Sequence, residues 1–391
     1  MSLKKQFIAS LIGLTMLFSC SKDNNGTTEA TPTDAKKTIE TTMDSFYNCL
    51  KNLNDGSFSK FLYDVAFEQV KTGKTRQVYV GGYWDNEKQQ YISQYAQKEE
   101  TTEWLTFLAE KYEENIGKFI KNKQYFNFQE LKGVYTYNKN ASRWEKTANS
   151  SKLEFYFPAD SKIITNNAKL VIENYSDKEI TFQNEKVRLP ITISLFASVD
   201  NEKVFSLEVN NVDYEVTSNI LMPIKANVTI FSNPFTTNIR LERKTPTVFD
   251  FAFNFSSPQG CSTTANAEIT LQNSNFDSFS AFDKDVKKIQ LTIGHNDLNI
   301  IANADIEGLF KSKKGNEKYS SEQINTYIKM EVFKGRNEKL ADLNYVEDAN
   351  GNFAPELIFS DGTKEKAEKY ISDFDVKIEQ IFKKFLDANK D

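Results

Sequence analysis

Histidine is almost absent from this chain of 391 residues, which contains only His295. Any Ser-His-acid or Cys-His mechanism would therefore depend on that one side chain. His295 lies in Gly294-His295-Asn296-Asp297, between two expected strands, which indicates a hairpin turn. The sequence also lacks a glycine-rich phosphate loop, a paired-histidine zinc motif and a nucleophile elbow. We therefore expect a protein that is not an enzyme and that needs no cofactor.

Cysteine is scarce as well, with three residues in the chain. Apart from Cys20 near the N-terminus, only Cys49 and Cys261 remain. They are available for one disulfide in an oxidising compartment, but Cys49 lies in an amphipathic helical pattern and fits a small buried hydrophobe equally. Structural zinc sites have closely spaced ligand pairs, so these two cysteines and His295 are not expected to assemble a metal site.

A dense block of basic residues is missing too. The chain has 49 basic and 54 acidic side chains, and its net charge changes from −5 to −7 once Lys4 and Lys5 are removed with the leader described below. Nucleic-acid binding requires a concentrated basic surface. Nucleic acid is therefore excluded as an expected partner.

Acidic residues are numerous, but their spacing gives no catalytic or metal site. Asp373 and Asp375 are two residues apart on an expected helix and so do not share a face. Asp283 and Asp285 flank Lys284 in an expected loop. The segment 348–352 has the composition of a calcium loop but lacks its terminal glutamate, which indicates a turn. No catalytic residue and no metal ligand is therefore assigned.

The N-terminus has the organisation of a signal peptide. Lys4 and Lys5 form a positive region, and residues 7–18 form an apolar stretch of twelve residues. A membrane span needs roughly 20 apolar residues, so this stretch is too short to serve as one. Leu17-Phe18-Ser19-Cys20 follows as a cleavage site, with a nucleophilic sulfur at its end.

This N-terminal segment resembles that of bacterial lipoproteins, with Leu17, Ser19 and Cys20 matching the lipobox and Phe18 departing from it. Ser21-Lys22-Asp23 is similar to the export signal of surface lipoproteins in the Bacteroidota. The resemblance implies removal of residues 1–19, a lipid on Cys20, membrane contact through that lipid, and a place in the cell envelope at the outer membrane. Whether the protein faces the periplasm or the outside stays open.

Beyond the lipobox, composition and periodicity divide the chain. Residues 20–33 are polar and lack a hydrophobic period, which predicts a flexible tether. Residues 34–130 are expected to be mainly helical, with apolar stripes beginning at Ile39 and at Trp104. A short strand over 77–83 and a turn at 84–86 are expected to interrupt the helices. Aromatic residues also gather in this region, at Tyr83, Trp84, Tyr91 and Tyr95. Packing against a core explains such a cluster, and sugar stacking by exposed rings is the alternative.

From 131 to roughly 306 the hydrophobic period changes to two, which predicts successive strands. Late strands extend this antiparallel sheet region to 362, with a loop at 311–316 and a segment at 320–322 that fits a short helix or a strand. Parallel crossovers have no room in this region, so neighbouring strands should be antiparallel. The strand 248–255 has the most regular alternation, with four phenylalanines on one face: Phe249, Phe251, Phe253 and Phe255. A structural core explains this wall, and the functional alternative is the lining of a cavity for an apolar ligand.

The C-terminal residues 363–391 repeat apolar side chains at steps of four and three, which predicts one long amphipathic helix. The whole pattern indicates an α+β fold, a large curved antiparallel sheet with N-terminal helices and the C-terminal helix packed on one face. In outline this architecture is similar to the half-barrel lipid and lipoprotein carriers of the LolA type.

Two functions fit these observations. The first is a non-enzymatic, lipid-anchored envelope protein that binds an apolar or amphipathic ligand between sheet and helices, with the phenylalanine wall as its lining. The second is a surface-exposed module that holds a glycan or a partner protein. The export signal Ser21-Lys22-Asp23 and the aromatic cluster around Trp84 support this function.

Overall fold

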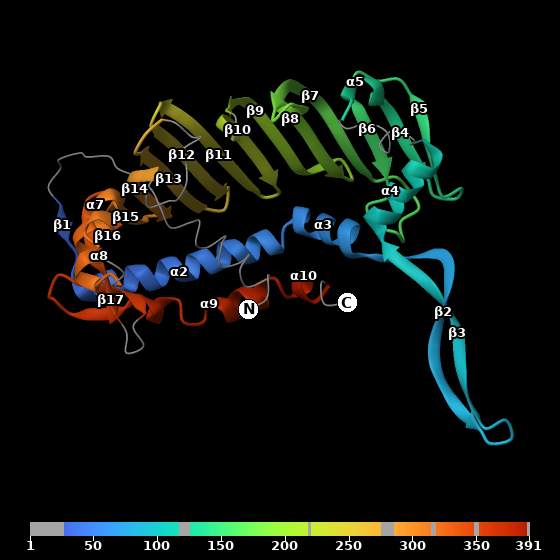
Figure 1. Cartoon of the computed structure of the whole chain (residues 1–391), viewed down its shortest axis with the longest axis horizontal. Helices are drawn as coiled ribbons and strands as arrows, with labels where there is room; N and C mark the ends of the chain where they lie inside the picture. Colours follow the sequence, from blue (N-terminus) through green and yellow to red (C-terminus); the bar gives the residue numbers. More distant parts are fainter. Residues whose placement is uncertain are drawn as a thin grey trace. The chain divides into compact units, whose positions relative to one another are not determined.

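The computed structural model describes residues 27–116, 126–217, 220–274, 285–313, 318–347 and 352–388. Cys20 and the lipoprotein leader lie outside these ranges, as do Asp283 and most of the expected calcium-like turn at 348–352. The fold is α+β, with helices at both ends and a large open sheet that is mostly antiparallel (Figure 1). The expected fold class is therefore confirmed.

Within the described ranges, seventeen strands form the large sheet. They are β1 (Thr28–Glu29), β4 (Gly133–Asn138), β5 (Arg143–Ala148), β6 (Leu153–Phe157), β7 (Ala168–Phe182), β8 (Glu185–Val199), β9 (Glu202–Val216), β10 (Leu221–Ser232), β11 (Phe235–Thr245), β12 (Val248–Ser257), β13 (Cys261–Leu271), β14 (Val286–His295), β15 (Leu298–Asp305), β16 (Ile328–Lys334), β17 (Glu338–Glu347), β18 (Phe353–Ile358) and β19 (Lys364–Lys366).

Most neighbours in this sheet follow one another in the chain. From β9 to β19 each strand pairs antiparallel with the next. Short turns make most of these connections, and α7 and α8 lie between β15 and β16. Among the described strands, two pairs are parallel, β4 with β6 and the short β1 with β17. The first described strand therefore pairs with one of the last.

The chain divides into two compact units. The first comprises residues 1–56, 174–195 and 205–386, and the second comprises 57–173, 196–204 and 387–391. The first unit contains α2 (Pro32–Asn54), α7 (Ile306–Lys311), α8 (Ser321–Tyr327), the 3-10 helix η2 (Ala367–Tyr370) and α9 (Phe374–Ile381). The second unit contains α3 (Ser57–Phe67), α4 (Trp104–Asn115) and α5 (Phe128–Leu131), and α10 (Lys383–Ala388) spans the boundary.

Helix α2 anchors the N-terminal part of the first unit to the sheet. Thr31 caps the helix by accepting a hydrogen bond from the Asp34 amide, and proline occupies the first turn, where its missing N–H costs nothing. Ala35 and Ile39 are buried with apolar residues of β16, β17 and β18. The other end of the helix carries Cys49, which is bonded to Cys261 of β13.

The C-terminal segment differs from the single long helix expected over 363–391. Residues 364–366 form β19 beside β18, and a 3-10 turn and a short connection precede α9. Glu365 holds this arrangement, since it accepts hydrogen bonds from Tyr370 and Lys369 and pairs with Lys36 of α2 at 2.9 Å. These donors lower the pKa of Glu365 to about 2. The apolar period continues through the segment, but these polar contacts interrupt the helix.

Helix α9 packs on α2 within the first unit. The rings of Phe374 and Tyr47 have centroids 6.0 Å apart, and the Lys377 ammonium lies 4.3 Å from the Tyr47 ring centre. The C-terminal and N-terminal helices are therefore neighbours in the first unit.

The second unit contains a long two-stranded hairpin, β2 (Gln69–Asp85) and β3 (Gln90–Glu103). The short strand expected over 77–83 is part of β2, but its partner strand β3 was not expected. The expected helical run before Trp104 is therefore wrong, and the acidic residues at 99, 100 and 103 belong to β3. Asp85 accepts hydrogen bonds from the amides of Glu87 and Lys88, which forms the turn. Figure 1 shows this hairpin extending away from α4.

Two tryptophans fix the core of the second unit. The Trp104 indole donates to the Pro158 carbonyl at 2.9 Å, and the Trp144 indole donates to the Leu108 carbonyl at 2.8 Å. Both side chains are buried, and Trp144 packs against four aromatic rings from α4, β4 and β6. Buried indoles with satisfied N–H groups make α4 a rigid base for the hairpin that precedes it.

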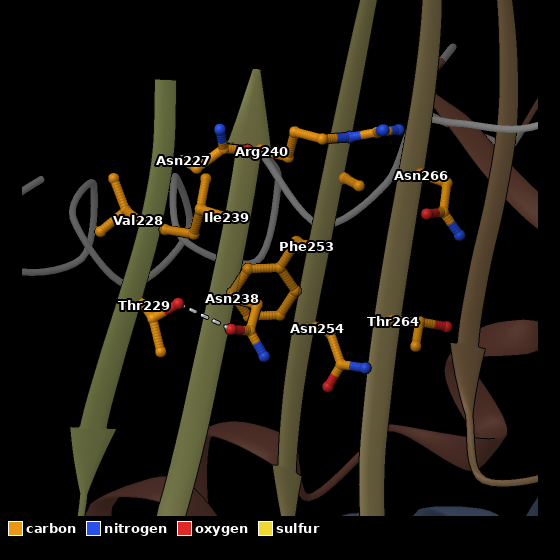
Figure 2. Close-up of a pocket in the computed structure, with 11 residues that line it drawn as sticks. Asn227, Val228, Thr229, Asn238, Ile239, Arg240, Phe253, Asn254, Thr264 and Asn266 are labelled. Carbon is orange, nitrogen blue, oxygen red and sulfur yellow. Dashed lines mark hydrogen bonds between the residues drawn. The ribbon is translucent and has the colours of Figure 1, made fainter. Parts of the chain in front are cut away.

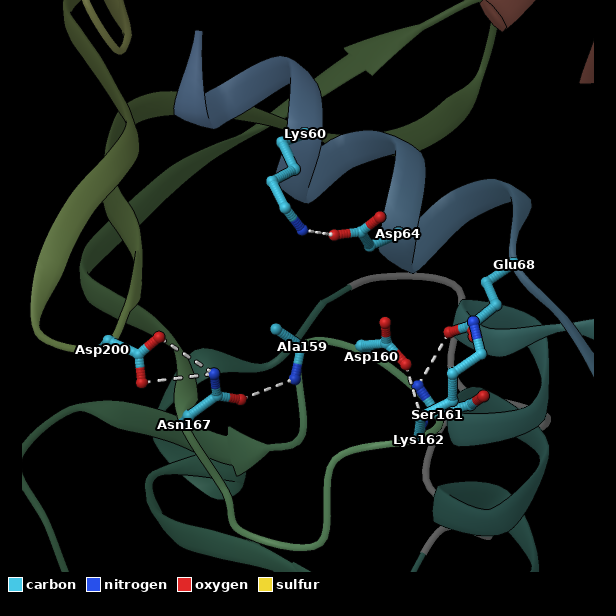
Figure 3. A network of polar contacts seen from close by, with 9 residues as sticks. All are labelled: Lys60, Asp64, Glu68, Ala159, Asp160, Ser161, Lys162, Asn167 and Asp200. Atoms are coloured by element: carbon cyan, nitrogen blue, oxygen red, sulfur yellow. Dashed lines mark hydrogen bonds and ion pairs between the residues drawn. The ribbon is translucent and has the colours of Figure 1, made fainter.

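A polar network joins the start of the hairpin to the loop after β6 (Figure 3). Glu68, directly before β2, accepts a hydrogen bond from the Ser161 amide at 2.7 Å and pairs with the Lys162 ammonium at 3.1 Å. Nearby, Asn167 bridges the Ala159 amide and the Asp200 carboxylate. The carboxylates of this network bind amides and ammonium groups, so their role is structural.

Candidate functional site

The candidate site is the exposed aromatic face of the β2–β3 hairpin. Tyr79 pairs with Tyr95 across the two strands, and Trp84 pairs with Tyr91. Because side chains alternate along a strand and a bulge at Val80 shifts the register of β2, all four rings lie on one face. We call these four residues the aromatic face. Tyr83 pairs with Ile92 on the opposite face.

Each ring of the aromatic face is more than half exposed. The exposed fractions are 52% for Tyr79, 54% for Trp84, 53% for Tyr91 and 60% for Tyr95. The expectation that Tyr83, Trp84, Tyr91 and Tyr95 pack against a core is therefore wrong. The helical spacing on which that expectation relied does not exist, because these residues lie in a two-stranded sheet. A contiguous exposed patch of this kind marks a binding surface more often than a single exposed ring does.

The rings hold one another in place. The Tyr79 and Tyr91 hydroxyls are 2.7 Å apart and form a hydrogen bond, and the centroids of Tyr79 and Tyr95 are 5.8 Å apart. Tyr91 also lies against the backbone of Gly82, where an added Cβ would come within 2.5 Å of its hydroxyl oxygen. Glycine at position 82 therefore lets the Tyr91 ring cross the hairpin and reach Tyr79.

Polar side chains continue the same face toward the base of the hairpin. Gln77 pairs with Gln97, and Ser93 pairs with Gly82 between the rings. Five basic and five acidic residues lie between 69 and 103, so the hairpin has no net formal charge. A flat aromatic surface beside amide and hydroxyl groups suits a neutral ligand that has both apolar faces and hydroxyls.

The four residues of the phenylalanine wall, Phe249, Phe251, Phe253 and Phe255, differ in how deeply they are buried in the first unit. Phe249 is buried in an apolar cluster with residues of β13, β14, β15 and α7. Phe255 stacks on the fully buried Phe235, with centroids 4.6 Å apart. Phe251 and Phe253 are half-buried. The two ends of the wall are therefore core, and only its centre is accessible to a ligand.

The apolar face of the sheet becomes more exposed from β13 toward β9. One cross-strand row contains Ala265 of β13, which is buried, and then three half-buried residues: Phe253, Ile239 and Val228. The row ends at Val209 of β9, which is also half-buried. This gradient leaves part of an apolar sheet face in contact with solvent.

The polar face of the same strands has a shallow hollow of about 240 Å³ (Figure 2). Four asparagine side chains from β10 to β13 line it: Asn227, Asn238, Asn254 and Asn266. Thr229 donates a hydrogen bond to Asn238 there, at 2.9 Å. Small-molecule sites usually enclose about 300–1,000 Å³, so this open hollow is below their range.

Cys49, Cys261 and His295 come together despite their spacing in the sequence. The cysteines form a disulfide with Cα atoms 5.8 Å apart. A ligand atom from each of the three residues lies within 4.8 Å of the others, and all three residues are buried. Of the two alternatives for the cysteines, the disulfide is therefore the one that forms, and His295 lies beside it. His295 is the last residue of β14 rather than a turn residue.

The described carboxylate candidates give no acid-base pair. Asp373 precedes α9 and pairs with Lys377 at 3.2 Å, and Asp285 is buried directly before β14. Sequence analysis missed Tyr79 as a member of the aromatic face. The sequence of β3 could have indicated this face, because Tyr91, Ser93, Tyr95 and Gln97 alternate there with residues of the other face.

Comparisons with protein-family models, with curated proteins and with solved structures found no match to this chain. None of the helices in the described ranges is long and apolar enough to cross a membrane. Function therefore has to be argued from the site itself.

Proposed function

We propose that this chain is a non-enzymatic protein of the cell envelope, attached to the outer membrane by a lipid on Cys20, and that its aromatic face binds a neutral glycan. The observation that carries the proposal is the exposure of four aromatic residues on one face of a hairpin, where Tyr79 bonds to the Tyr91 hydroxyl and meets the Tyr95 ring edge-to-face. Exposing that much aromatic surface to water is unfavourable, so its retention is best explained by a ligand that covers it.

The chemistry of the face favours sugar over other ligands. Aromatic faces are electron-rich, and the C–H groups of a pyranose ring are their weakly positive complements. Gln77, Gln97 and Ser93 supply amide and hydroxyl groups for sugar hydroxyls on the same face. The zero net charge of the hairpin gives no attraction for a strongly anionic ligand. Tyrosine and tryptophan also lose little side-chain entropy on binding.

The test is an array of neutral oligosaccharides, probed with the chain from Ser21 onward, followed by calorimetric titration of the best ligand. Trp84→Ala and Tyr91→Ala should each weaken binding about tenfold, since each removes one stacking surface. Tyr83→Ala is the matched control, because Tyr83 is 51% exposed on the opposite face of the same hairpin. Silence on the array, or an equal loss in the control, would contradict the proposal.

A second candidate function is the binding of an apolar or amphipathic ligand against the centre of the phenylalanine wall. The exposure gradient from Ala265 to Val209 supports it, because Phe251 and Phe253 lie where the apolar face is half-buried. Such a ligand would cover apolar area at roughly 25 cal/mol per Å².

Organic extraction of the purified chain, followed by mass spectrometry, tests this second function. We expect a co-purifying lipid, and Phe253→Ser should reduce its amount several-fold by placing a hydroxyl in the apolar row. Ala252→Ser is the matched control on the polar face of β12. Extracts without lipid, or equal lipid in both variants, would exclude this function.

A further inference from the structure

Three soft ligand groups meet beneath the first unit's sheet edge. Cys49 comes from α2, Cys261 begins β13 and His295 ends β14. Their exposed fractions are 5%, 4% and 8%. Phe235, Phe255 and Leu53 pack around the two sulfurs and keep water away. The proposed glycan function uses none of these residues.

Hydrogen bonds orient the imidazole of His295 toward Cys49. Its Nδ1 lies 2.8 Å from the Thr263 hydroxyl, and its Nε2 lies 3.3 Å from the Ser45 hydroxyl and 4.0 Å from the Cys49 sulfur. The Ser45 oxygen accepts a hydrogen bond from Asn296, so its own proton is available for Nε2. This arrangement assigns the proton of the neutral ring to Nδ1 and the lone pair to Nε2.

A neutral imidazole with its Nδ1–H held by another group is the form in which histidine binds metals.

We propose that reduction of the Cys49–Cys261 disulfide converts this cluster into a zinc site. A dithiol reductant supplies two electrons and two protons, so the sulfur–sulfur bond breaks, two thiols form and the reductant closes its own disulfide. Zn²⁺ then displaces both thiol protons to solvent and binds two thiolates and Nε2 of His295. The oxidised cluster offers only weakly donating disulfide sulfurs.

Charge and coordination favour Zn²⁺ over other metals here. Two thiolates balance the two charges of the ion, so the loaded site is neutral, as burial requires. Zinc prefers four ligands in a tetrahedron, and when the ion takes the Nε2 lone pair, the Ser45 hydroxyl, 3.3 Å from Nε2, is free to supply the fourth oxygen or to hold a water there. The two sulfurs and the nitrogen suit borderline-soft zinc better than magnesium or calcium.

The start of β13 gives a reductant a route to the Cys49–Cys261 disulfide. Cys261 follows the turn residues 258–260, which are exposed. Local opening of this turn would give a dithiol access to the Cys261 sulfur without unfolding the sheet. The zinc site would therefore form only in a reducing setting.

The experiment uses the chain from Ser21 onward, reduced with a phosphine, desalted without oxygen and titrated with zinc against a chromophoric chelator. We expect one zinc per reduced chain and none per oxidised chain. His295→Ala should weaken zinc binding at least 100-fold by removing a ligand. Thr263→Val should weaken it about tenfold, because Thr263 only positions the ring.

Ser262→Ala is the matched control, since Ser262 neighbours Thr263 but points to the other face of β13. Near-ultraviolet circular dichroism reports whether the reduced chain keeps its fold. Three results would overturn the proposal: no zinc uptake by the folded reduced chain, equal affinity in His295→Ala, or loss of the fold on reduction even with zinc present. Failure of glycan binding would leave the zinc result unaffected.

Discussion

Replacing both Cys49 and Cys261 with alanine is expected to lower the free energy of unfolding of the first unit by about 2–5 kcal/mol. The two cysteines are 212 residues apart in the sequence. A bridge across so long a loop restricts the unfolded chain strongly, which is the main source of disulfide stabilisation in the chain-entropy account. The bridge also fixes the end of α2 against Phe235 and Phe255.

Urea denaturation followed by circular dichroism measures this loss. Cys49→Ala alone and Cys261→Ala alone should each cost nearly as much as the double variant, because either change removes the bridge. Domains are typically stable by 5–15 kcal/mol, so the bridge-free unit should remain folded at neutral pH. A double variant within 1 kcal/mol of the parent chain would show that the bridge adds little to packing.

A Cys20→Ala chain is expected to lose acylation completely and to leave the membrane fraction of the producing cells. The reason is chemical, since the Cys20 sulfur is the atom that would receive the diacylglyceryl group in the proposed lipid anchor. Each buried methylene of such chains contributes about 0.8 kcal/mol to membrane binding, and two or more chains give a stable anchor. Without these acyl chains, the expected tether over residues 20–33 has no anchor in the bilayer.

Labelled palmitate and cell fractionation measure that change. Ser21→Ala is the matched control, because it alters the neighbouring residue and leaves the sulfur. The parent chain and the control should carry label and sediment with membranes. Label on the Cys20→Ala chain, or a parent chain that carries none, would refute the lipid anchor.

Long, regular patterns in the sequence were sufficient to predict much of this fold. The stripe from Ile39 to Leu53 gave α2, and strict alternation gave strands such as β12 and β14. These signals are reliable because each element buries one face, so its apolar period is set by its own geometry. The antiparallel order followed from the short connections between strands.

Only the first strand of the hairpin was predicted, and β3 was missed for a physical reason. The second half of β3 contains Gln97-Lys98-Glu99-Glu100, residues with good helix propensity, and neither face of the hairpin is buried in a core. Without a buried face, alternation between apolar and polar residues is weak. The cluster of Cys49, Cys261 and His295 was missed because it depends on contacts more than 200 residues apart, and no local pattern encodes them.

The pairing of β1 with β17 has a consequence for how the chain assembles. Thr28 is hydrogen-bonded to Asn337, and Ala30 to Lys339, so β1 can join the sheet only after β17, far along the chain, has been synthesised. Contacts so distant in sequence slow folding, because a long loop must close before they form. Helix α2 must therefore wait, with its apolar stripe uncovered, for its docking strands to emerge, which makes the nascent chain a natural client for holding chaperones.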